Sequence, residues 1–159
     1  MAISLQPFFE WSGNTWLSLE IRDSTWQFAI LEMVHLAGLA ILLGALVVID
    51  LRLFGFGMRN MRPSQLAQEL RRWMRIGMVT VLGSGVLLFF GEPMKLYGNP
   101  SFQVKMMLLF FALLLQVTLF RRVRSDSVPS GSAMSTIIGT VTLVLWFGVG
   151  LAGRAIGFL

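Results

Sequence analysis

WQFAILEMVHLAGLAILLGALVV, residues 26–48, is the stretch of sequence that decides the fold. At about 1.5 Å per residue, a helix of this length crosses the roughly 30 Å hydrocarbon layer of a membrane. The stretch nevertheless contains Glu32 and His35, and His35 is the single histidine of the chain. Because ionisable groups are expensive to place inside a membrane, this pair is the first candidate for a functional site.

The composition of the whole chain is that of a membrane protein. Of its 159 residues, 55% are hydrophobic, and the mean hydropathy of +0.73 lies well outside the range of soluble domains. The net charge of +5 comes from arginines that gather in short segments between apolar runs. That pattern sets membrane topology and does not favour nucleic acid as a partner. The absence of cysteine excludes disulfides, thiolate metal sites and covalent c-type haem attachment.

Three further apolar runs follow the first, and they predict spans at about residues 73–91, 101–120 and 133–152. Pro63 is expected to start a short helix on the membrane surface before the second span. At the end of the first span, we interpret Asp50 and Arg52 as a boundary pair near the inner surface of the membrane rather than as a proton relay. Residues 3–21 are too polar to span and predict an interfacial amphipathic segment, or a plug over the mouth of the bundle.

These patterns together predict an all-α, polytopic membrane protein with a single domain over residues 1–159. Its four spans, joined by short connections, favour an up-down-up-down bundle. The loops after the first and third spans hold nine of the 13 basic residues. The positive-inside rule therefore puts both loops in the cytoplasm and both termini outside.

Several polar residues are expected in the outer half of this bundle. His35 lies about 13 Å below the outer boundary at Trp26. Glu32 is one turn from it, while Lys105 and Arg154 belong to the outer ends of the third and fourth spans. These residues would suit b-type haem, with His35 as ligand of the iron, the glycines of facing helices admitting the porphyrin, and the cations pairing with its propionates.

A single histidine leaves the second axial ligand of such a haem open. Two copies of the chain could share a haem, Met106 or Met107 could be the second ligand, or the iron could be five-coordinate. His35 could instead contact a quinone or transfer protons. A purely structural interpretation, in which His35 hydrogen-bonds to Glu32 or to a neighbouring helix and locks the packing, also remains open.

Four short motifs carry a resemblance to a known family: Trp26-x-Phe28, His35-Leu36-x-Gly38, Asp50-Leu51-Arg52-Leu53 and Gly153-Arg154-x-Ile156-Gly157. In this order they resemble an uncharacterised family of small bacterial four-helix integral membrane proteins. More loosely, the arrangement is similar to four-helix membrane b-type cytochromes and to copper-resistance membrane proteins. The resemblance implies the bacterial inner membrane and adds Gly38 to the candidate cofactor contacts. The chain departs from the bis-histidine pattern of those cytochromes.

The leading hypothesis is a membrane redox subunit that binds haem b or quinone near His35 and exchanges electrons with a partner protein. No enzymatic activity is expected of the chain on its own. The alternative is a cofactor-free structural or accessory subunit of a larger membrane complex, and a small transporter is less favoured. Expected partners are membrane lipid and either further copies of the chain or other subunits of a membrane complex.

Overall fold

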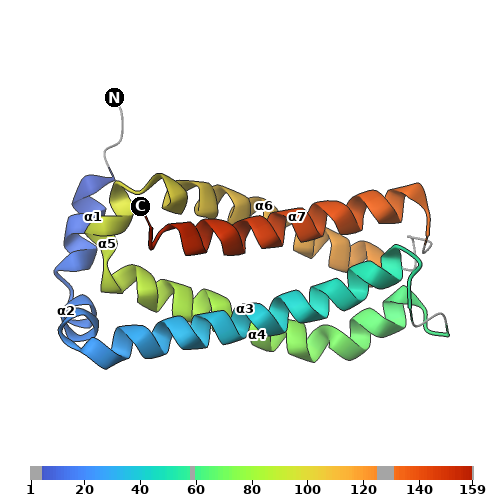
Figure 1. The fold of residues 1–159 in the computed structure, drawn as a ribbon, viewed down its shortest axis with the longest axis horizontal. Coiled ribbons are helices and arrows are strands. Elements are labelled where there is room, and N and C mark those ends of the chain that lie inside the picture. Colours follow the sequence, from blue (N-terminus) through green and yellow to red (C-terminus); the bar gives the residue numbers. More distant parts are fainter. Residues whose placement is uncertain (1–4, 58–59, 125–130, 159) are drawn as a thin grey trace.

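Four long helices run side by side in the computed structural model, which describes residues 5–57, 60–124 and 131–158 (Figure 1). They are α3 (Thr25–Leu53), α4 (Pro63–Gly91), α6 (Pro100–Arg124) and α7 (Ala133–Ala155). Each contains a segment long and apolar enough to cross a membrane. The prediction of an all-α bundle with four spans is confirmed, and the chain is a multi-pass membrane protein.

Short polar side chains set the starts of three of these helices. Ser24 Oγ accepts a hydrogen bond from the backbone N–H of Gln27 at the start of α3, and Ser132 Oγ accepts one from that of Ser135 at the start of α7. Asn99 Oδ1 does the same for the N–H of Ser101 in α6, at 2.9 Å. Such caps satisfy backbone donors that have no partner inside the helix.

Helix α4 differs from the sequence-based expectation. The short surface helix expected from Pro63 and the span expected from residue 73 are one continuous helix, Pro63–Gly91. A proline in the first turn is compatible with a helix, and neither proline nor glycine follows it before Gly77. The basic first part of α4 therefore extends the span instead of lying apart from it.

The bundle is built from two close pairs of helices, α3 with α4 and α6 with α7, and α3 also packs against α7. At the α3–α4 seam, a Cβ atom on Gly77 would lie only 2.8 Å from the backbone nitrogen of Leu42. The two backbones are therefore in direct contact, which small residues allow in membrane helices. Helix α6 is the most exposed of the four, since only 11% of its most apolar stretch is buried.

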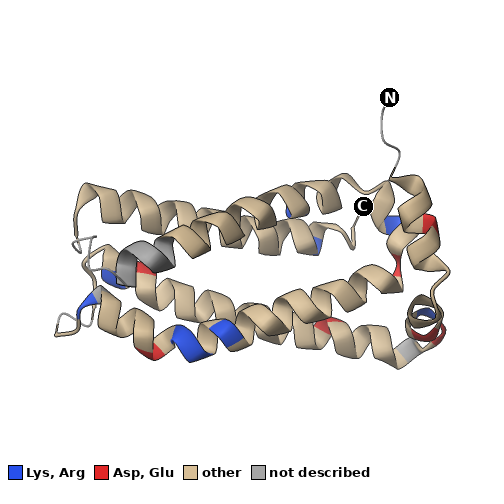
Figure 2. Ribbon diagram, turned by 180° about the vertical axis from the view of Figure 1, so that it is seen from behind, with Lys and Arg blue, Asp and Glu red and all other residues tan. Residues whose placement is uncertain are grey.

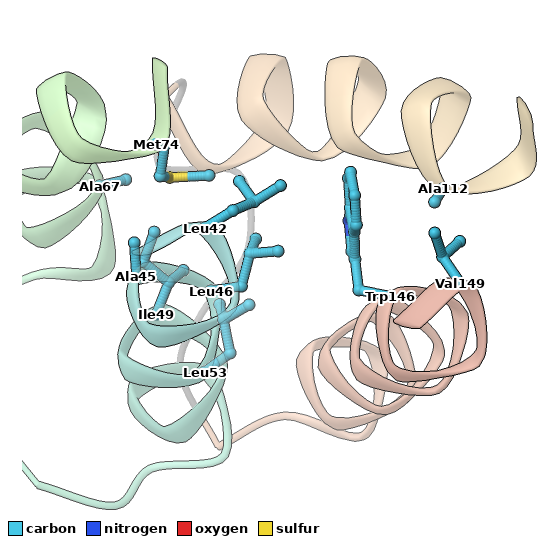
Figure 3. Close-up of a cluster of buried hydrophobic side chains, with 10 residues drawn as sticks. All are labelled: Leu42, Ala45, Leu46, Ile49, Leu53, Ala67, Met74, Ala112, Trp146 and Val149. Carbon is cyan, nitrogen blue, oxygen red and sulfur yellow. The ribbon is translucent and has the colours of Figure 1, made fainter. Parts of the chain in front are cut away.

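The buried apolar core joins the two pairs of helices (Figure 3). Trp146 of α7 lies between α3 and α6, and its Nε1 donates a hydrogen bond of 3.3 Å to Gln116 Oε1 of α6. This bond satisfies the indole N–H inside the core. The core consists of Leu42, Ala45, Leu46, Ile49, Leu53, Ala67, Met74, Ala112, Trp146 and Val149.

Three short helices cover one end of the bundle, which we call the capped end (Figure 1). They are α1 (Gln6–Gly13), α2 (Trp16–Asp23) and α5 (Pro93–Tyr97). The ring of Phe9 packs 5.3 Å from that of Phe89 and 5.1 Å from that of Tyr97. The polar segment expected at residues 3–21 thus forms two helices packed onto the ends of the long ones.

At the opposite end of the bundle, which we call the loop end, α3 ends and both α4 and α7 begin (Figure 1). The backbone N–H of Gly131 and the hydroxyl of Ser135 both donate to the carbonyl oxygen of Leu53, and so tie the start of α7 to the end of α3. The basic residues of α3 and α4 and the arginine before α4 lie in this half of the bundle (Figure 2): Arg52 of α3, Arg62 immediately before α4, and Arg71, Arg72 and Arg75 of α4.

Candidate functional site

His35 lies on the face of α3 that packs against α4 and is half-buried there. Its imidazole rests on Gly85, because a Cβ atom at that position would stand 3.3 Å from Cε1 of the ring. Its Nδ1 lies 2.9 Å from the hydroxyl oxygen of Ser84. The sequence left open whether His35 would bond to Glu32 or to a neighbouring helix, and the structure has it bonded to the neighbouring helix.

The hydrogen bonds of Ser84 determine the state of the imidazole. The Ser84 hydroxyl donates to the carbonyl oxygen of Thr80, one turn earlier in α4. A hydroxyl has one hydrogen, so towards His35 it can only accept, and Nδ1 must carry the donated proton. In the neutral ring, Nε2 then has a lone pair, and the hydrogen-bond partners of the ring among the described residues both belong to α4: the hydroxyl of Ser84 and the backbone of Val81. His35 therefore offers an oriented acceptor, or a ligand for a metal.

Lys105 of α6 is the second polar group at this site. The lysine stem lies along Gly153 of α7, where a Cβ atom would be 3.2 Å from Nζ. In the described part of the chain no hydrogen bond or ion pair satisfies the ammonium group. An acceptor at Nε2 of His35 and a donor at Lys105 thus lie in the half of the bundle nearer the capped end.

The other predicted contact residues are not brought to this pair. Glu32 is exposed and forms no hydrogen bond with His35, while Met107 is 63% exposed and lies two residues beyond Lys105, on another side of α6. Gly38 is buried against α4, where a Cβ atom would stand 2.7 Å from the Thr80 side chain. The guanidinium of Arg154 is exposed and lies 5.1 Å from the centre of the Phe158 ring.

The glycines of α4 serve helix packing, whereas the sequence suggested that they admit a porphyrin. Gly77 meets the backbone of α3, Gly85 meets His35, and a Cβ atom on Gly91 would stand 2.9 Å from the ring of Phe28. Gly83 has open space beside it. The α3–α4 seam is therefore filled by the side chains and backbone of α3.

Asp50 is a polar group that sequence reasoning misjudged. It is fully buried, and neither carboxyl oxygen has a hydrogen-bond partner in the described part of the chain. The expected pair with Arg52 is wrong, because residues two apart on a helix point in different directions. Arg52 instead donates from Nε to the carbonyl oxygen of Met61, at 2.8 Å. The helical spacing of Asp50 from Leu46 and Leu53 was the signal that places it on the core face.

The fold and these two polar positions define a class of protein: a small four-span membrane bundle with one ionisable site in each half. The chain belongs to DUF6644, a family of unknown function, whose profile matches residues 8–159. Comparisons with curated proteins and with solved structures gave no match. Within the described residues, no group of three or more His, Cys, Asp or Glu side chains is placed to hold a metal ion.

Proposed function

We propose that the protein is an integral membrane redox subunit that binds a quinone at His35 and Lys105 and exchanges electrons with a partner protein. The observation that carries the proposal is the hydrogen-bond chain from His35 through Ser84 to Thr80. It orients the imidazole with a lone pair on Nε2, in the half of the bundle where Lys105 has no hydrogen bond or ion pair to a described residue. No enzymatic activity of the isolated chain is proposed.

A quinone head group matches this pair of side chains. The hydroxyl of its reduced form can donate a hydrogen bond to Nε2 of His35. A carbonyl oxygen of its oxidised form can accept a hydrogen bond from the ammonium group of Lys105. Because the ligand is lipid-soluble, it can reach the site between the helices from the membrane. Exposed apolar side chains such as Leu36 and Val104 belong to the same parts of α3 and α6.

Haem b is the second candidate cofactor. In its favour, the hydroxyl of Ser84 bonds to Nδ1 of His35, as hydrogen-bond acceptors bond to the second ring nitrogen of metal-bound histidines and orient the ring. In that orientation, Nε2 is the nitrogen that would ligate the iron. Against it, α3 fills the glycine seam of α4, and Met107 points away from the site. When bound, haem would supply one-electron transfer, and Lys105 would pair with a propionate. The residues present therefore fit a quinone better than a porphyrin.

A cofactor-free structural or accessory subunit is the alternative function. The hydrogen bond between His35 and Ser84 favours this function, because it joins α3 to α4 without a cofactor. The large apolar exposure of α6 would in that case serve contact with lipid, with other subunits or with further copies of the chain.

For the cellular setting, we propose a bacterial inner membrane. The loop end, with its arginines, would face the cytoplasm by the positive-inside rule, and the capped end would face outward. The quinone site would then lie in the outer half of the membrane, and the redox partner would dock at the outer surface or inside the membrane plane.

The proposal is tested on protein purified in lipid nanodiscs, by its absorption spectrum and by extraction and mass measurement of bound quinone. We expect no Soret band and a quinone that co-purifies with the wild type but is lost in His35→Ala and Lys105→Gln. Loss of one hydrogen bond to a charged donor costs about 1.5–3 kcal/mol, so Lys105→Gln should weaken quinone affinity roughly 10- to 100-fold. Met107→Leu, on the exposed side of α6, is the matched control and should bind as the wild type does.

Other outcomes separate the alternatives. A redox-sensitive Soret band that disappears in His35→Ala would replace quinone by haem b. If Met107→Leu also changed that band, the methionine would be its second ligand. A colourless protein that neither retains nor binds quinone would leave the structural subunit as the function.

A further inference from the structure

Asp50 lies inside the seam between α3 and α7, in the half of the bundle nearer the loop end. It is 0% exposed, and it shares the buried face of α3 with Leu46 and Leu53. From α7 it meets Gly139, where a Cβ atom would stand 3.4 Å from Oδ1 of the carboxyl group. The missing side chain of the glycine makes the room that the carboxyl group occupies.

No described group compensates a charge on this carboxyl. Neither oxygen accepts or donates a hydrogen bond, and the hydroxyl of Thr142, one turn along α7, donates to the carbonyl oxygen of Ile138 instead. Arg52 is engaged with Met61, and the single ionisable residue of α7 is Arg154, at the capped end. The charged residues of α4 nearest this end are exposed: Glu69, Arg71, Arg72 and Arg75. Helix α6 contributes residues 121, 122 and 124 near this end, and all three lie outside the described side chains.

An ionised carboxyl without partners is far more costly in such a place than a neutral one. Transfer of a lone carboxylate out of water is so unfavourable that the group takes up a proton instead. A protonated carboxyl still prefers a hydrogen-bond partner, but it carries no charge to desolvate. Asp50 is therefore compatible with the tight α3–α7 contact in its acid form.

We propose that Asp50 is a proton-binding site of the membrane domain, occupied when α3 and α7 are packed together. The ligand is a single proton on the carboxyl group, and its release requires the seam to open so that water reaches the carboxylate. The site is separate from His35, because Asp50 follows His35 by fifteen positions in α3, or about 22 Å along the helix axis. Buried Leu42 and Leu46 occupy the interval. Proton binding at Asp50 therefore does not depend on cofactor binding at His35.

Carboxyl-specific spectroscopy tests the proposal directly. The chain has three aspartates, at positions 23, 50 and 126, so protein labelled with ¹³C at the aspartate side-chain carboxyl gives few signals. Solid-state NMR in lipid bilayers at neutral pH should show the Asp50 carbon as a carboxylic acid. The exposed Asp23 should give the signal of a carboxylate. Spectra of Asp50→Asn and Asp23→Asn, each lacking one signal, make the assignments.

The same samples distinguish the proposal from its rivals. Asp50→Asn replaces the acid by a neutral group of the same shape, and we expect its unfolding midpoint to match that of the wild type. A carboxylate signal from Asp50 at neutral pH would overturn the proposal. In that case, a carboxyl signal that shifts when Na⁺ is added at constant pH would indicate a cation site. A signal that does not change with Na⁺ would indicate an ion pair with an arginine. The spectrum of the wild type decides even if a variant fails to fold.

Discussion

Gly77→Ala should loosen the α3–α4 seam and disturb the His35 site at the same time. The added Cβ would stand 2.8 Å from the nitrogen and 3.0 Å from the Cα of Leu42, and 3.0 Å from the carbonyl oxygen of Gly38. All three atoms belong to the backbone of α3, so none can swing aside as a flexible side chain would. Ordinary contact begins at 3.4 Å, and the helices must therefore separate by about 0.6 Å.

The loss of folding free energy and the change in the distance between His35 and Ser84 can both be estimated. Overpacking of this kind costs about 1–3 kcal/mol of folding free energy. Ser84 lies two turns further along α4, about 10 Å away. If the separation extends that far, the 2.9 Å bond between His35 and Ser84 would stretch towards 3.5 Å, at the limit of a hydrogen bond. Stability should then fall, and quinone binding at His35 should weaken with it.

The assay is equilibrium unfolding in mixed micelles, with quinone affinity measured on the folded fraction. Gly83→Ala is the matched control, because it lies in the same helix and a Cβ there meets nothing within 4 Å. The control should be neutral or slightly stabilising, since alanine favours a helix over glycine by about 1 kcal/mol in water. Equal unfolding free energies for Gly77→Ala and Gly83→Ala would refute the close backbone contact.

Three further predictions follow from other contacts. Gly139→Ala should lower the unfolding free energy by about 1–3 kcal/mol, because its Cβ would lie 2.8 Å from the ring of Phe54; the additional change Phe54→Leu should recover part of the loss in the same unfolding assay. Gln116→Leu removes the acceptor of the buried Trp146 N–H and should cost about 1–3 kcal/mol, visible as a lower unfolding midpoint, whereas Trp146→Phe made in that background should cost less than it does alone. A phosphatase or fluorescent-protein reporter fused after residue 126 should report the cytoplasm, and an external signal there would reverse the proposed orientation.

The fold was largely readable from the sequence because its signals are long and redundant. Four apolar runs, separated by two arginine clusters and by one turn that contains two prolines, determine the number of spans. Ser24 marks the start of α3, as its residue type predicts. The exact length of α4 was not readable, since Pro63 starts a surface helix and a long span equally well. Hydropathy decides whether a segment is inserted, whereas continuity of a helix depends on the absence of a break.

The candidate site was readable only in part, because contacts between helices are not encoded by spacing along the chain. His35 stands out as an ionisable residue in a span, yet its partner Ser84 is an ordinary serine in a stretch rich in small residues. The haem interpretation relied on glycines of α4 as room for a porphyrin, but atoms of α3 occupy the space beside Gly77, Gly85 and Gly91. For Asp50, proximity in sequence to Arg52 suggested an ion pair that helical geometry forbids.

Glycines face two of the ionisable residues of α3, His35 and Asp50, and this suggests a common physical reason for their positions. The ring of His35 rests on Gly85 of α4, and the carboxyl of Asp50 lies against Gly139 of α7. A larger residue at either position would push the polar group out of the seam, towards lipid, where no partner would replace its lost hydration. Close approach to a glycine backbone instead keeps each group inside the bundle. The functions proposed for the two groups differ because their surroundings differ. His35 is half-buried and hydrogen-bonded to Ser84, so it can contact a ligand from the membrane, whereas Asp50 is fully buried without a hydrogen-bond partner among the described residues, so the ligand proposed there is a proton.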